Sequence, residues 1–347
     1  MTSKSEITIA DVARAAGVSV STVSRILNDR PDVSEATRRQ VTKVIAELGF
    51  EPHAHARRLA AGQSRTIALL DPVNRSGGQP QQIDQLHLDF MVGAASAASE
   101  ANYFFNVLTN FSGERKLLSL YRSAQVDGVL LMEVYQNDPR VALLRQQGFP
   151  FVMIGRCADD DELSYVELDL EGAAQLAFDH LVGLGHTRIG FIGFDADLQN
   201  QGYGPAVRAW AGYQAALAKH GLSPAHRETP YRAQDMGDAT LSLLAERPDL
   251  TAIVGMADAA MIGVFNALRQ SGRRIPEDIS VVGLAVDRLA ELMTPALTAI
   301  RFPSFEMGHE AAAVLIRQLQ DEAAAPEQKL VPLEIVQRGS SGPAHQN

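Results

Sequence analysis

Hydrophobic positions in the first fifty residues recur every three or four residues, in three short stretches. This spacing places them on one face of a helix, so the pattern predicts three amphipathic helices. Thr8, Ser19 and Ser34 precede these helices as N-caps, and Gly17 and Gly49 follow the first and third as turns. The expected inward faces are Ile9, Val12, Ala13 and Ala16, then Val23, Ile26 and Leu27, and finally Val41, Val44, Ile45 and Leu48.

The first two of these helices, joined by a tight turn, predict a helix-turn-helix. In that motif the second helix enters the major groove of DNA and presents its N-terminal residues to base edges. Small hydroxyl side chains suit phosphate oxygens, and Arg25 can make a bidentate contact to guanine. A solvated helix pair within a larger helical domain is the alternative. The candidate DNA-contacting residues are Thr8, Ser19, Val20, Ser21, Thr22, Ser24, Arg25 and Asn28.

The charge distribution supports a nucleic-acid partner for this head. The whole chain has a net charge of −10, yet residues 1–65 hold 10 Lys and Arg against 7 Asp and Glu. A basic head therefore precedes an acidic body, and phosphate contacts require positive charge.

Residues 51–63 predict a hinge between the head and the body. Pro52 ends the preceding element, and "HAHARRLAA" has good helix propensity and is closed by Gly62. Eight or nine residues are too few to hold a helix alone in water. The segment can therefore be coil when free and helix when DNA and a partner hinge cover it. A plain linker is the alternative.

From Thr66 onward, short apolar runs alternate with helical patterns. The runs "TIALL", "FFNVLT", "GVLLM", "FVMIG", "RIGFIG", "AIVGM" and "ISVVGL" predict buried parallel strands. Their alternation with helices predicts a doubly wound α/β fold, in which ligands bind beyond the carboxyl ends of the strands. We expect a helix-turn-helix domain over 1–50, the hinge over 51–63, and an effector-binding and dimerisation core over 64–347.

Polar residues near the ends of these strands are the candidate ligand contacts. Asp258 sits at a helix start, where capping the helix is the alternative role. Arg156 and Arg208 could instead hold a carboxylate or phosphate. The candidate effector-binding residues are Asp71, His87, Asp89, Glu133, Tyr135, Arg156, Arg208, Asp258 and Asp287.

The segments "TIADVARAAGVSVSTVSRILN" and "VSEATRRQVTKVIAELGFEPHAHARRLAAGQSRTIALL" resemble the lac-repressor (LacI/GalR) family of bacterial transcription regulators. The resemblance continues through "LGHTRIGFIG", "DISVVGLA", "TPALTAIRFP" and "LEIVQRGSS", so it covers essentially the whole chain. It implies an all-α helix-turn-helix head on a two-lobed core like the periplasmic binding proteins. Lobe one is expected over about 64–168 and 298–325, and lobe two over about 169–297 and 326–347.

The same resemblance implies a homodimer on a palindromic double-stranded operator, controlled by a small-molecule effector, most often a sugar. The hinge helix would enter the minor groove, where the leucine at position 59 would wedge between bases. The hinge residues that match this pattern are His53, Ala56, Arg57 and Leu59, with His53 replacing the more usual Asn. Arg208 matches the arginine that grips ligand oxygens.

Two positions depart from the sugar-responsive pattern. Ala257 and Ala285 stand where relatives usually carry an Asn and an Asp. Two hydrogen-bonding partners for sugar hydroxyls are therefore missing, each worth about 1–3 kcal/mol when buried. Either Arg156, Glu133 and Asp287 take over, or the effector is not an ordinary monosaccharide. A corepressor-dependent regulator with a non-sugar effector is the alternative function.

Other classes of protein fit the sequence less well. It holds no GxxxxGK[ST], GxGxxG or GxSxG motif and no nucleophile–base pattern, so we expect neither an enzyme nor a cofactor or metal site. "GHEAAAV" around His309 lacks the second His of a zinc protease. The start has no apolar signal-peptide run, no stretch reaches the length of a membrane span, and Cys157 is the single cysteine, which favours the cytoplasm. A solute-binding protein is a further alternative that the helix-turn-helix disfavours.

Overall fold

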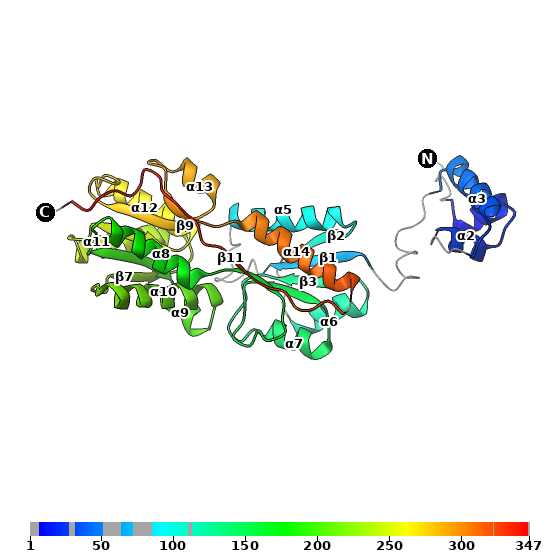
Figure 1. Ribbon diagram of the computed structural model, residues 1–347, viewed down its shortest axis with the longest axis horizontal. Coiled ribbons are helices and arrows are strands. Elements are labelled where there is room, and N and C mark those ends of the chain that lie inside the picture. The colour runs from blue at the N-terminus through cyan, green and yellow to red at the C-terminus, as the bar shows by residue number, and fades with distance from the viewer. Residues whose placement is uncertain are drawn as a thin grey trace. The chain divides into compact units, whose positions relative to one another are not determined.

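The computed structural model of the chain consists of two compact units, Met1–Arg65 and Thr66–Asn347 (Figure 1). It describes residues 7–27, 32–50, 64–71, 85–109, 113–321 and 323–345. No helix within these ranges is long and apolar enough to cross a membrane. The boundary at Arg65 falls just after the predicted hinge.

The first unit contains the three predicted helices, α1 (Ile9–Ala15), α2 (Val20–Leu27) and α3 (Glu35–Leu48). The side chain of Thr8 accepts a hydrogen bond from the backbone N–H of Asp11, whose carboxylate accepts one from Thr8 in return, which closes a capping box at the start of α1. Ser34 caps α3, and Gly49 ends it in the left-handed conformation. The buried core of this unit is Val12, Ala13, Ala16, Val23, Ile26, Val41 and Phe50.

The first lobe of the core unit is a six-stranded sheet with helices on both faces. The strand order is β11-β5-β4-β3-β1-β2. The strands are β1 (Thr66–Asp71), β2 (Phe104–Thr109), β3 (Gly128–Leu131), β4 (Phe151–Ile154), β5 (Tyr165–Leu168) and β11 (Gln328–Val331). Helices α5 (Gln85–Glu100) and α14 (Ser304–Gln320) cover one face, and α6 (Glu114–Arg122) and α7 (Pro139–Gln147) cover the other. All strand pairs in this sheet are parallel.

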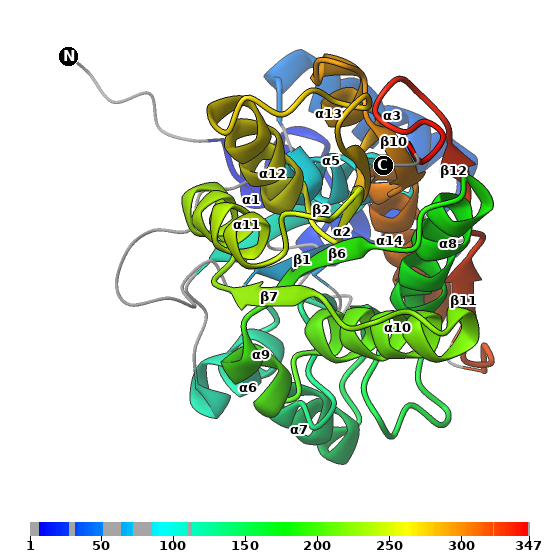
Figure 2. The ribbon, with the colours of Figure 1, turned by 90° about the vertical axis from the view of Figure 1, so that its left-hand side faces the viewer.

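The second lobe repeats this plan with the strand order β12-β10-β9-β8-β6-β7. Its strands are β6 (Ile189–Phe194), β7 (His226–Thr229), β8 (Ala252–Gly255), β9 (Ser280–Ala285), β10 (Thr298–Arg301) and the antiparallel β12 (Ile335–Val336). Figure 2 shows α8 (Leu170–Gly183) and α10 (Gly204–His220) on one side of the sheet, and α11 (Ala233–Glu246) and α12 (Asp258–Gln270) on the other. Two short helices, α9 (Ala196–Asn200) and α13 (Asp287–Leu292), follow strands β6 and β9. The predicted doubly wound fold is therefore present in both lobes.

The lobes exchange two strands relative to the predicted boundaries. Strand β10 pairs with β9 in the second sheet, although residues 298–325 were expected in lobe one. Strand β11 pairs with β5 in the first sheet, although residues 326–347 were expected in lobe two. The chain therefore crosses between the lobes three times, after β5, after β10 and after β11, because α14 and β11 return to lobe one together before β12 pairs with β10.

Helix α14 packs directly on α5, although the two lie far apart in the sequence (Figure 1). Glycines permit this approach: a Cβ on Gly93 would lie 2.0 Å from the carbonyl oxygen of Phe305, and one on Gly308 would lie 2.3 Å from that of Phe90. Each helix thus presents its glycine to the backbone of the other. Lobe one is complete only when this late helix is in place.

Strand β2 differs from its prediction as a buried strand. It forms the edge of the first sheet and pairs with β1 alone. Phe104 is 57 % exposed and Val107 is 37 % exposed. The apolar run "FFNVLT" reads like a core strand, but an edge position leaves its side chains largely uncovered within one chain.

Candidate functional site

The exposed face of α2 is the candidate DNA-contacting surface of the first unit. Val23 and Ile26 are buried against α1 and α3, so Val20, Ser21 and Arg25 face outward, as predicted. The Arg25 guanidinium lies 3.4 Å from the carboxylate of Asp32, and both side chains are more than half exposed. An ion pair this exposed contributes little free energy, so Arg25 can exchange Asp32 for a nucleic-acid acceptor at small cost.

The hydroxyl groups at the start of α2 form a local network. Ser19 accepts a hydrogen bond from the backbone N–H of Thr22 at 3.1 Å, which caps the helix, and its hydroxyl also lies 2.7 Å from that of Ser21. Thr8 is likewise engaged in its capping box. Ser24 is partly buried on the same helix. A role of these hydroxyls in phosphate contacts stays a prediction.

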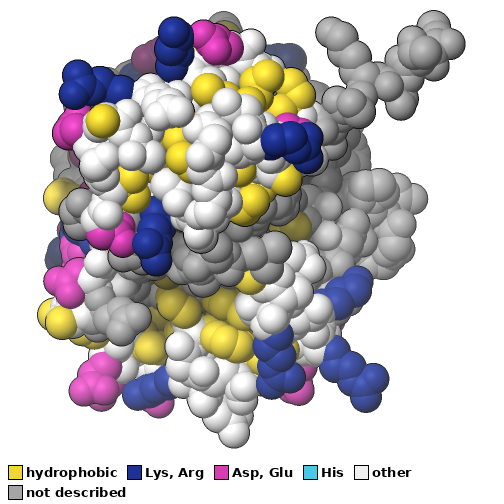
Figure 3. Space-filling view, turned by 90° about the vertical axis from the view of Figure 1, so that its right-hand side faces the viewer, with side chains coloured by type: hydrophobic (Ala, Val, Ile, Leu, Met, Phe, Trp, Pro, Cys, Tyr) yellow, Lys and Arg dark blue, Asp and Glu magenta, His cyan; other side chains and the backbone are white. Residues whose placement is uncertain are grey.

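The remaining DNA candidates lie outside the described residues: Asn28, His53, Ala56, Arg57 and Leu59. On the face drawn in Figure 3, the Lys and Arg side chains of the described residues stand in separate groups, several beside Asp or Glu.

A cavity of about 350 Å³ lies in the core unit at the carboxyl ends of strands from both lobes. Glu133 follows β3, Gly155 follows β4, Asp195 follows β6 and Met256 follows β8, and all four line it. This is the place at which doubly wound sheets bind ligands, and the volume falls in the range of small-molecule sites. The predicted position of the ligand cleft thus coincides with a cavity.

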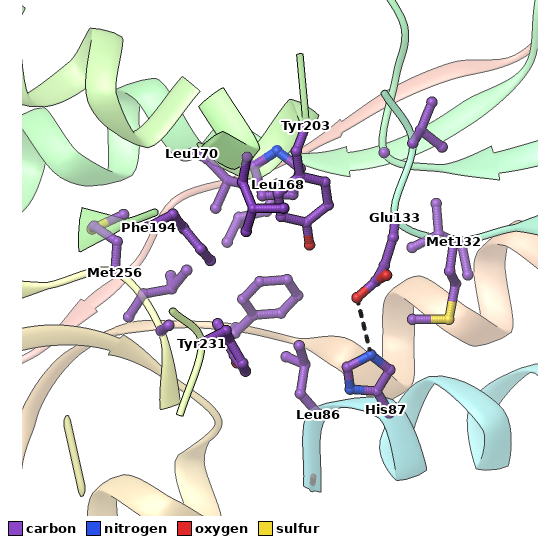
Figure 4. Close-up of a pocket in the computed structure, with 18 of the residues that line it drawn as sticks. Leu86, His87, Met132, Glu133, Leu168, Leu170, Phe194, Tyr203, Tyr231 and Met256 are labelled. Carbon is purple, nitrogen blue, oxygen red and sulfur yellow. Dashed lines mark ion pairs between the residues drawn. The ribbon is translucent and has the colours of Figure 1, made fainter. Parts of the chain in front are cut away.

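Aromatic rings form much of the cavity wall. Tyr203 lies between Tyr135 of lobe one, with ring centroids 5.7 Å apart, and Phe194 of lobe two, at 6.0 Å. Phe194 in turn stacks on Tyr231 at 5.8 Å. Figure 4 shows Phe194, Tyr203 and Tyr231 around the opening, with Glu133 and His87 on the opposite side. Such a wall can cover the apolar face of a ligand.

Glu133 and His87 supply polar atoms on the lobe-one side. His87 Nε2 lies 3.5 Å from Glu133 Oε1, and both side chains are almost fully buried (Figure 4). The backbone of Glu133 has a φ of 51°, in the left-handed region that a non-glycine residue adopts only when its surroundings hold it there. Such strained positions cluster at binding sites.

An ion triad, in which Glu167 and Arg208 are buried, joins the two lobes beside the cavity. The Glu167 carboxylate on β5 forms ion pairs with Arg156 Nε at 2.8 Å and with Arg208 Nη1, on α10, at 2.9 Å. Arg208 Nη2 also donates to the carbonyl oxygen of Arg156 at 2.7 Å. Burial raises the pKa of the Glu167 carboxyl from 4.5 to about 7, against the opposing effect of the two arginines.

Backbone hydrogen bonds join the lobes at a second place. The N–H of Gln136 donates to the carbonyl of Gly202 at 2.7 Å, and the N–H of Gly204 donates to the carbonyl of Val134 at 3.1 Å. Tyr135 and Tyr203 are paired as an antiparallel bridge between these bonds. The segment after β3 and the start of α10 are thus joined into one wall of the cavity.

Four of the predicted effector residues line the cavity: His87, Glu133, Tyr135 and Asp258. Asp258 is the first residue of α12, directly after the N-cap position at Ala257. Contact of these four residues with an effector stays a prediction. The side chain of Asp71, at the end of β1, lies outside the described residues.

The structure places four other candidates outside the lining. Asp89 accepts from Gln85 at 2.6 Å and from Ser304 at 3.2 Å. Asp287 lies 2.7 Å from Arg301 and 3.0 Å from Arg338. The remaining two are Arg156 and Arg208, held by Glu167. Arg156 follows β4 and Asp287 begins α13, as predicted, whereas Asp89 and Arg208 are each the fifth residue of their helix. The side chain of each is turned to a partner within the protein.

Sequence reasoning missed several lining residues, among them Glu167, Asp195, Asp197, Tyr203 and Tyr231. Asp195 directly follows a predicted strand, so the strand-end rule applied evenly would have found it. Glu167 is an acidic residue inside an apolar strand, which is itself a signal. The two tyrosines lie outside the strands and carried no signal of this kind.

Comparisons with known proteins agree with this geometry. Residues 8–53 match the family model described as bacterial regulatory proteins, lacI family, and residues 178–341 match that of the periplasmic binding protein-like domain. The HTH-type transcriptional regulator CelR of Thermobifida fusca is 33 % identical over 340 residues, which cover 96 % of this chain and 98 % of that protein. The chain belongs to the lacI family. It is therefore a DNA-binding transcriptional regulator.

Other members of the lacI family are similar over the same length. The ribose operon repressor of Escherichia coli is 32 % identical over 96 % of this chain and 99 % of its own. The lac repressor dimer bound to operator and the anti-inducer ONPF superposes with a TM-score of 0.82, at 25 % identity over 97 % of this chain and 99 % of that one. The transcriptional regulator CelR in complex with cellobiose superposes with a TM-score of 0.70, at 30 % identity over 96 % of this chain and 99 % of that one. The expected fold class is thus confirmed.

Proposed function

We propose that this lacI-family member is a homodimeric repressor that binds a near-palindromic operator and leaves it when a small molecule fills the cavity. The observation that carries the proposal is the joint presence of an outward-facing α2 and a cavity between two lobes on one chain. Relatives named for cellobiose and ribose support a carbohydrate as the effector class.

On the DNA side, Arg25 is the proposed base-reading residue. It lies on the exposed face of α2, and its present partner Asp32 is an exposed carboxylate that DNA can replace. The neighbouring Ser21 and Val20 are also exposed and complete a small contact surface. The hinge residues around Leu59 are proposed to enter the minor groove, as the family resemblance implies.

An apolar surface on lobe one supports the homodimer. Phe104 and Val107 of β2, Leu88 and Val92 of α5, and Phe305 of α14 are all exposed. The elements that carry them are adjacent, since α5 contacts both β2 and α14. Large apolar side chains that gather on a surface mark a protein interface. A second copy of the chain is the proposed cover, which would pair the heads for an inverted repeat.

The effector acts through the two lobes. Both lobes contribute lining, and the triad and the Tyr135–Tyr203 bridge connect them, so a ligand that changes their relative position changes the preferred position of the hinge ends. Coupling free energies between such sites are about 1–3 kcal/mol, or about 5–150-fold in affinity. A corepressor would act through the same coupling between cavity and DNA-binding head, but would raise operator affinity instead of lowering it.

The test is selection of DNA from a random-sequence pool by the full chain, followed by anisotropy titrations on the selected sequence. The expected result is an inverted repeat, bound at least about fivefold more weakly by Arg25→Ala, because a bidentate base contact is worth about 1–3 kcal/mol. Addition of cellobiose or ribose to the complex then gives the sign of the effector response.

Arg39→Ala is the matched control, because Arg39 is also an exposed arginine, on α3. The substitution removes one positive charge and leaves α2 unchanged, so the preferred base at each position of the operator should stay the same. Selection of no symmetric sequence by the wild-type protein would refute the proposal. If the ligand tightened operator binding, the protein would be a corepressor-dependent regulator and not an inducible repressor.

A further inference from the structure

An ion pair behind the cavity holds one stretch of its wall. Residues 132–135 follow β3 directly, and all four line the cavity, whereas Asp138 and Arg140 lie outside the lining. Arg140 Nε and Nη2 donate to the two carboxylate oxygens of Asp138, at 3.0 and 2.7 Å. The Asp138 side chain is 1 % exposed and the Arg140 side chain 21 %. We call this pair the Asp138–Arg140 clamp.

The Arg140 guanidinium also holds the backbone on both sides of Glu133. Nη2 donates to the carbonyl oxygen of Met132 at 3.0 Å and to that of Glu133 at 3.1 Å. These carbonyls belong to the two planar peptide groups that flank the Glu133 Cα, and the orientations of those groups define its φ and ψ. The φ of Glu133 is 51°, a conformation that a non-glycine residue keeps only when its surroundings impose it. Arg140 supplies that constraint.

Asp138 fixes the other end of the same stretch. Its carboxylate accepts a hydrogen bond from the backbone N–H of Tyr135 at 3.2 Å, and one from the N–H of Arg140 at 2.9 Å, which caps α7. Burial raises the pKa of the Asp138 carboxyl, but the hydrogen bonds and the charge of Arg140 outweigh burial, so the pKa lies below its usual value. The carboxylate therefore stays ionised and accepts all of these bonds.

The position of Arg140 is unfavourable for its own helix. It is the second residue of α7, where the helix dipole favours negative charge. Its side chain instead turns back to Asp138 and to the carbonyls after β3. The contacts with the cavity wall, and not the helix, therefore account for an arginine at this place.

The clamped stretch is also the part of lobe one that bonds to lobe two. The carbonyl of Val134 accepts from the N–H of Gly204, and the N–H of Gln136 donates to the carbonyl of Gly202. Val134 directly follows Glu133, and Gln136 directly follows Tyr135. Each bond between the lobes thus lies next to a residue whose backbone the clamp holds.

We propose that Arg140 and Asp138 are positioning residues of the effector site: from outside the cavity they hold Glu133 and Tyr135 in the conformation that receives a ligand and bonds to lobe two. This inference rests on the proposed function, since it concerns the same cavity. Ligand affinity and the contact between the lobes then depend on a pair of side chains that the ligand does not touch.

Hydrogen exchange tests the clamp on the full chain, without DNA or ligand. An amide exchanges when its hydrogen bond opens locally, so Gln136 and Gly204 report the two bonds between the lobes. In Arg140→Met, both amides should exchange at least about tenfold faster than in wild type, whereas the amides inside β1 and β9 should keep their rates. Unchanged exchange at Gln136 and Gly204, or an equal rise inside the two strands, would overturn the proposal.

Two further variants separate positioning from folding. Arg145→Met is the matched control, because Arg145 lies on the same helix and pairs with Asp159 at 3.1 Å at the surface, so exchange at Gln136 and Gly204 should not change. Where Arg140→Met fails to fold by circular dichroism, the double variant Asp138→Asn with Arg140→Met is measured in its place. It leaves neither charge of the pair, and the same rise in exchange is expected.

Sugar titrations extend the test to ligand binding. Cellobiose and ribose are titrated by calorimetry into wild type, Arg140→Met and Arg145→Met. A sugar that binds wild type should bind Arg140→Met at least about tenfold more weakly, because a site loses its geometry with its support, and should bind Arg145→Met as tightly. Equal affinity of wild type and Arg140→Met would overturn the inference. Since the exchange measurement needs neither DNA nor ligand, a failure of the proposed repressor function in DNA selection is distinguishable from a failure of the clamp.

Discussion

The ion triad makes a quantitative prediction about Arg208. Arg208→Met keeps an unbranched apolar stem but removes a guanidinium that contacts Glu167 at 2.9 Å and the carbonyl of Arg156 at 2.7 Å. Breaking a buried ion pair on one side costs about 3–5 kcal/mol. Because Arg156 still lies 2.8 Å from the same carboxylate, we expect the lower end, about 3 kcal/mol.

The double variant should recover much of this loss. In Arg208→Met with Glu167→Gln, no charge is left buried opposite an apolar group, and Arg156 remains partly exposed to water. The two substitutions should therefore show a coupling free energy of at least about 2 kcal/mol, whereas unlinked sites add within about 0.5 kcal/mol.

Urea unfolding at about pH 8, where Glu167 is ionised, measures this coupling. Trp210 is the single tryptophan and lies in α10 near Arg208, so its fluorescence reports the core unit and not the head. Arg317→Met, which breaks half-exposed pairs with Glu310 and Glu327, is the control and should cost less than about 1 kcal/mol. If the changes in unfolding free energy of Arg208→Met and Glu167→Gln simply added in the double variant, the reasoning would be refuted.

Three further predictions concern other parts of the mechanism. Since the pKa of Glu167 is raised from 4.5 to about 7, its contribution to stability is fully present below about pH 4.5 and is lost as the pH rises towards 7. Wild type should therefore lose stability relative to Glu167→Gln as the pH rises from about 4.5 to 7, as measured by urea unfolding at stepped pH. The titratable and charged groups around Glu167 are Arg156, Arg208, Tyr165, Asp160 and Asp169. A difference in unfolding free energy between the two proteins that does not change with pH would contradict this prediction. Phe104→Lys should weaken dimerisation at least about tenfold in sedimentation experiments, because an apolar anchor is worth about 2 kcal/mol; Leu330→Lys, exposed at the opposite edge of the same sheet, should not. Leu59→Ala should lower operator affinity and leave effector affinity unchanged; equal loss of both would mean that the hinge assignment is wrong.

The sequence predicts the local structure of this protein well because local rules decide it. The caps at Thr8 and Ser34 and the αL glycine Gly49 follow from neighbours within four residues, and all three occur as expected. The strand-end rule likewise brings Glu133 and Tyr135 to the cavity. Each of these features depends on periodicity or on the carbonyl and N–H groups of adjacent residues.

Features that depend on distant partners were not predictable in this way. Arg208 matches the family pattern, yet its direction is set by Glu167 on a strand of the other lobe. The exposure of Phe104 follows from the edge position of β2, which the apolar run itself does not reveal. The placement of β10 beside β9 depends on pairing between strands and not on helical or strand periodicity.

The return of α14 and β11 to the first sheet has a consequence for synthesis on the ribosome. The strands of lobe one that are made first end at Leu168, but their partner β11 ends at Val331. At about 5–20 residues per second, the early sheet waits roughly 8–30 s while the part of one face that α14 will cover stays uncovered. Lobe two also has five of its six strands by Arg301, but its last strand, β12, is complete by Val336. The unfinished first lobe is therefore the stage at which the nascent chain most needs protection by chaperones from aggregation.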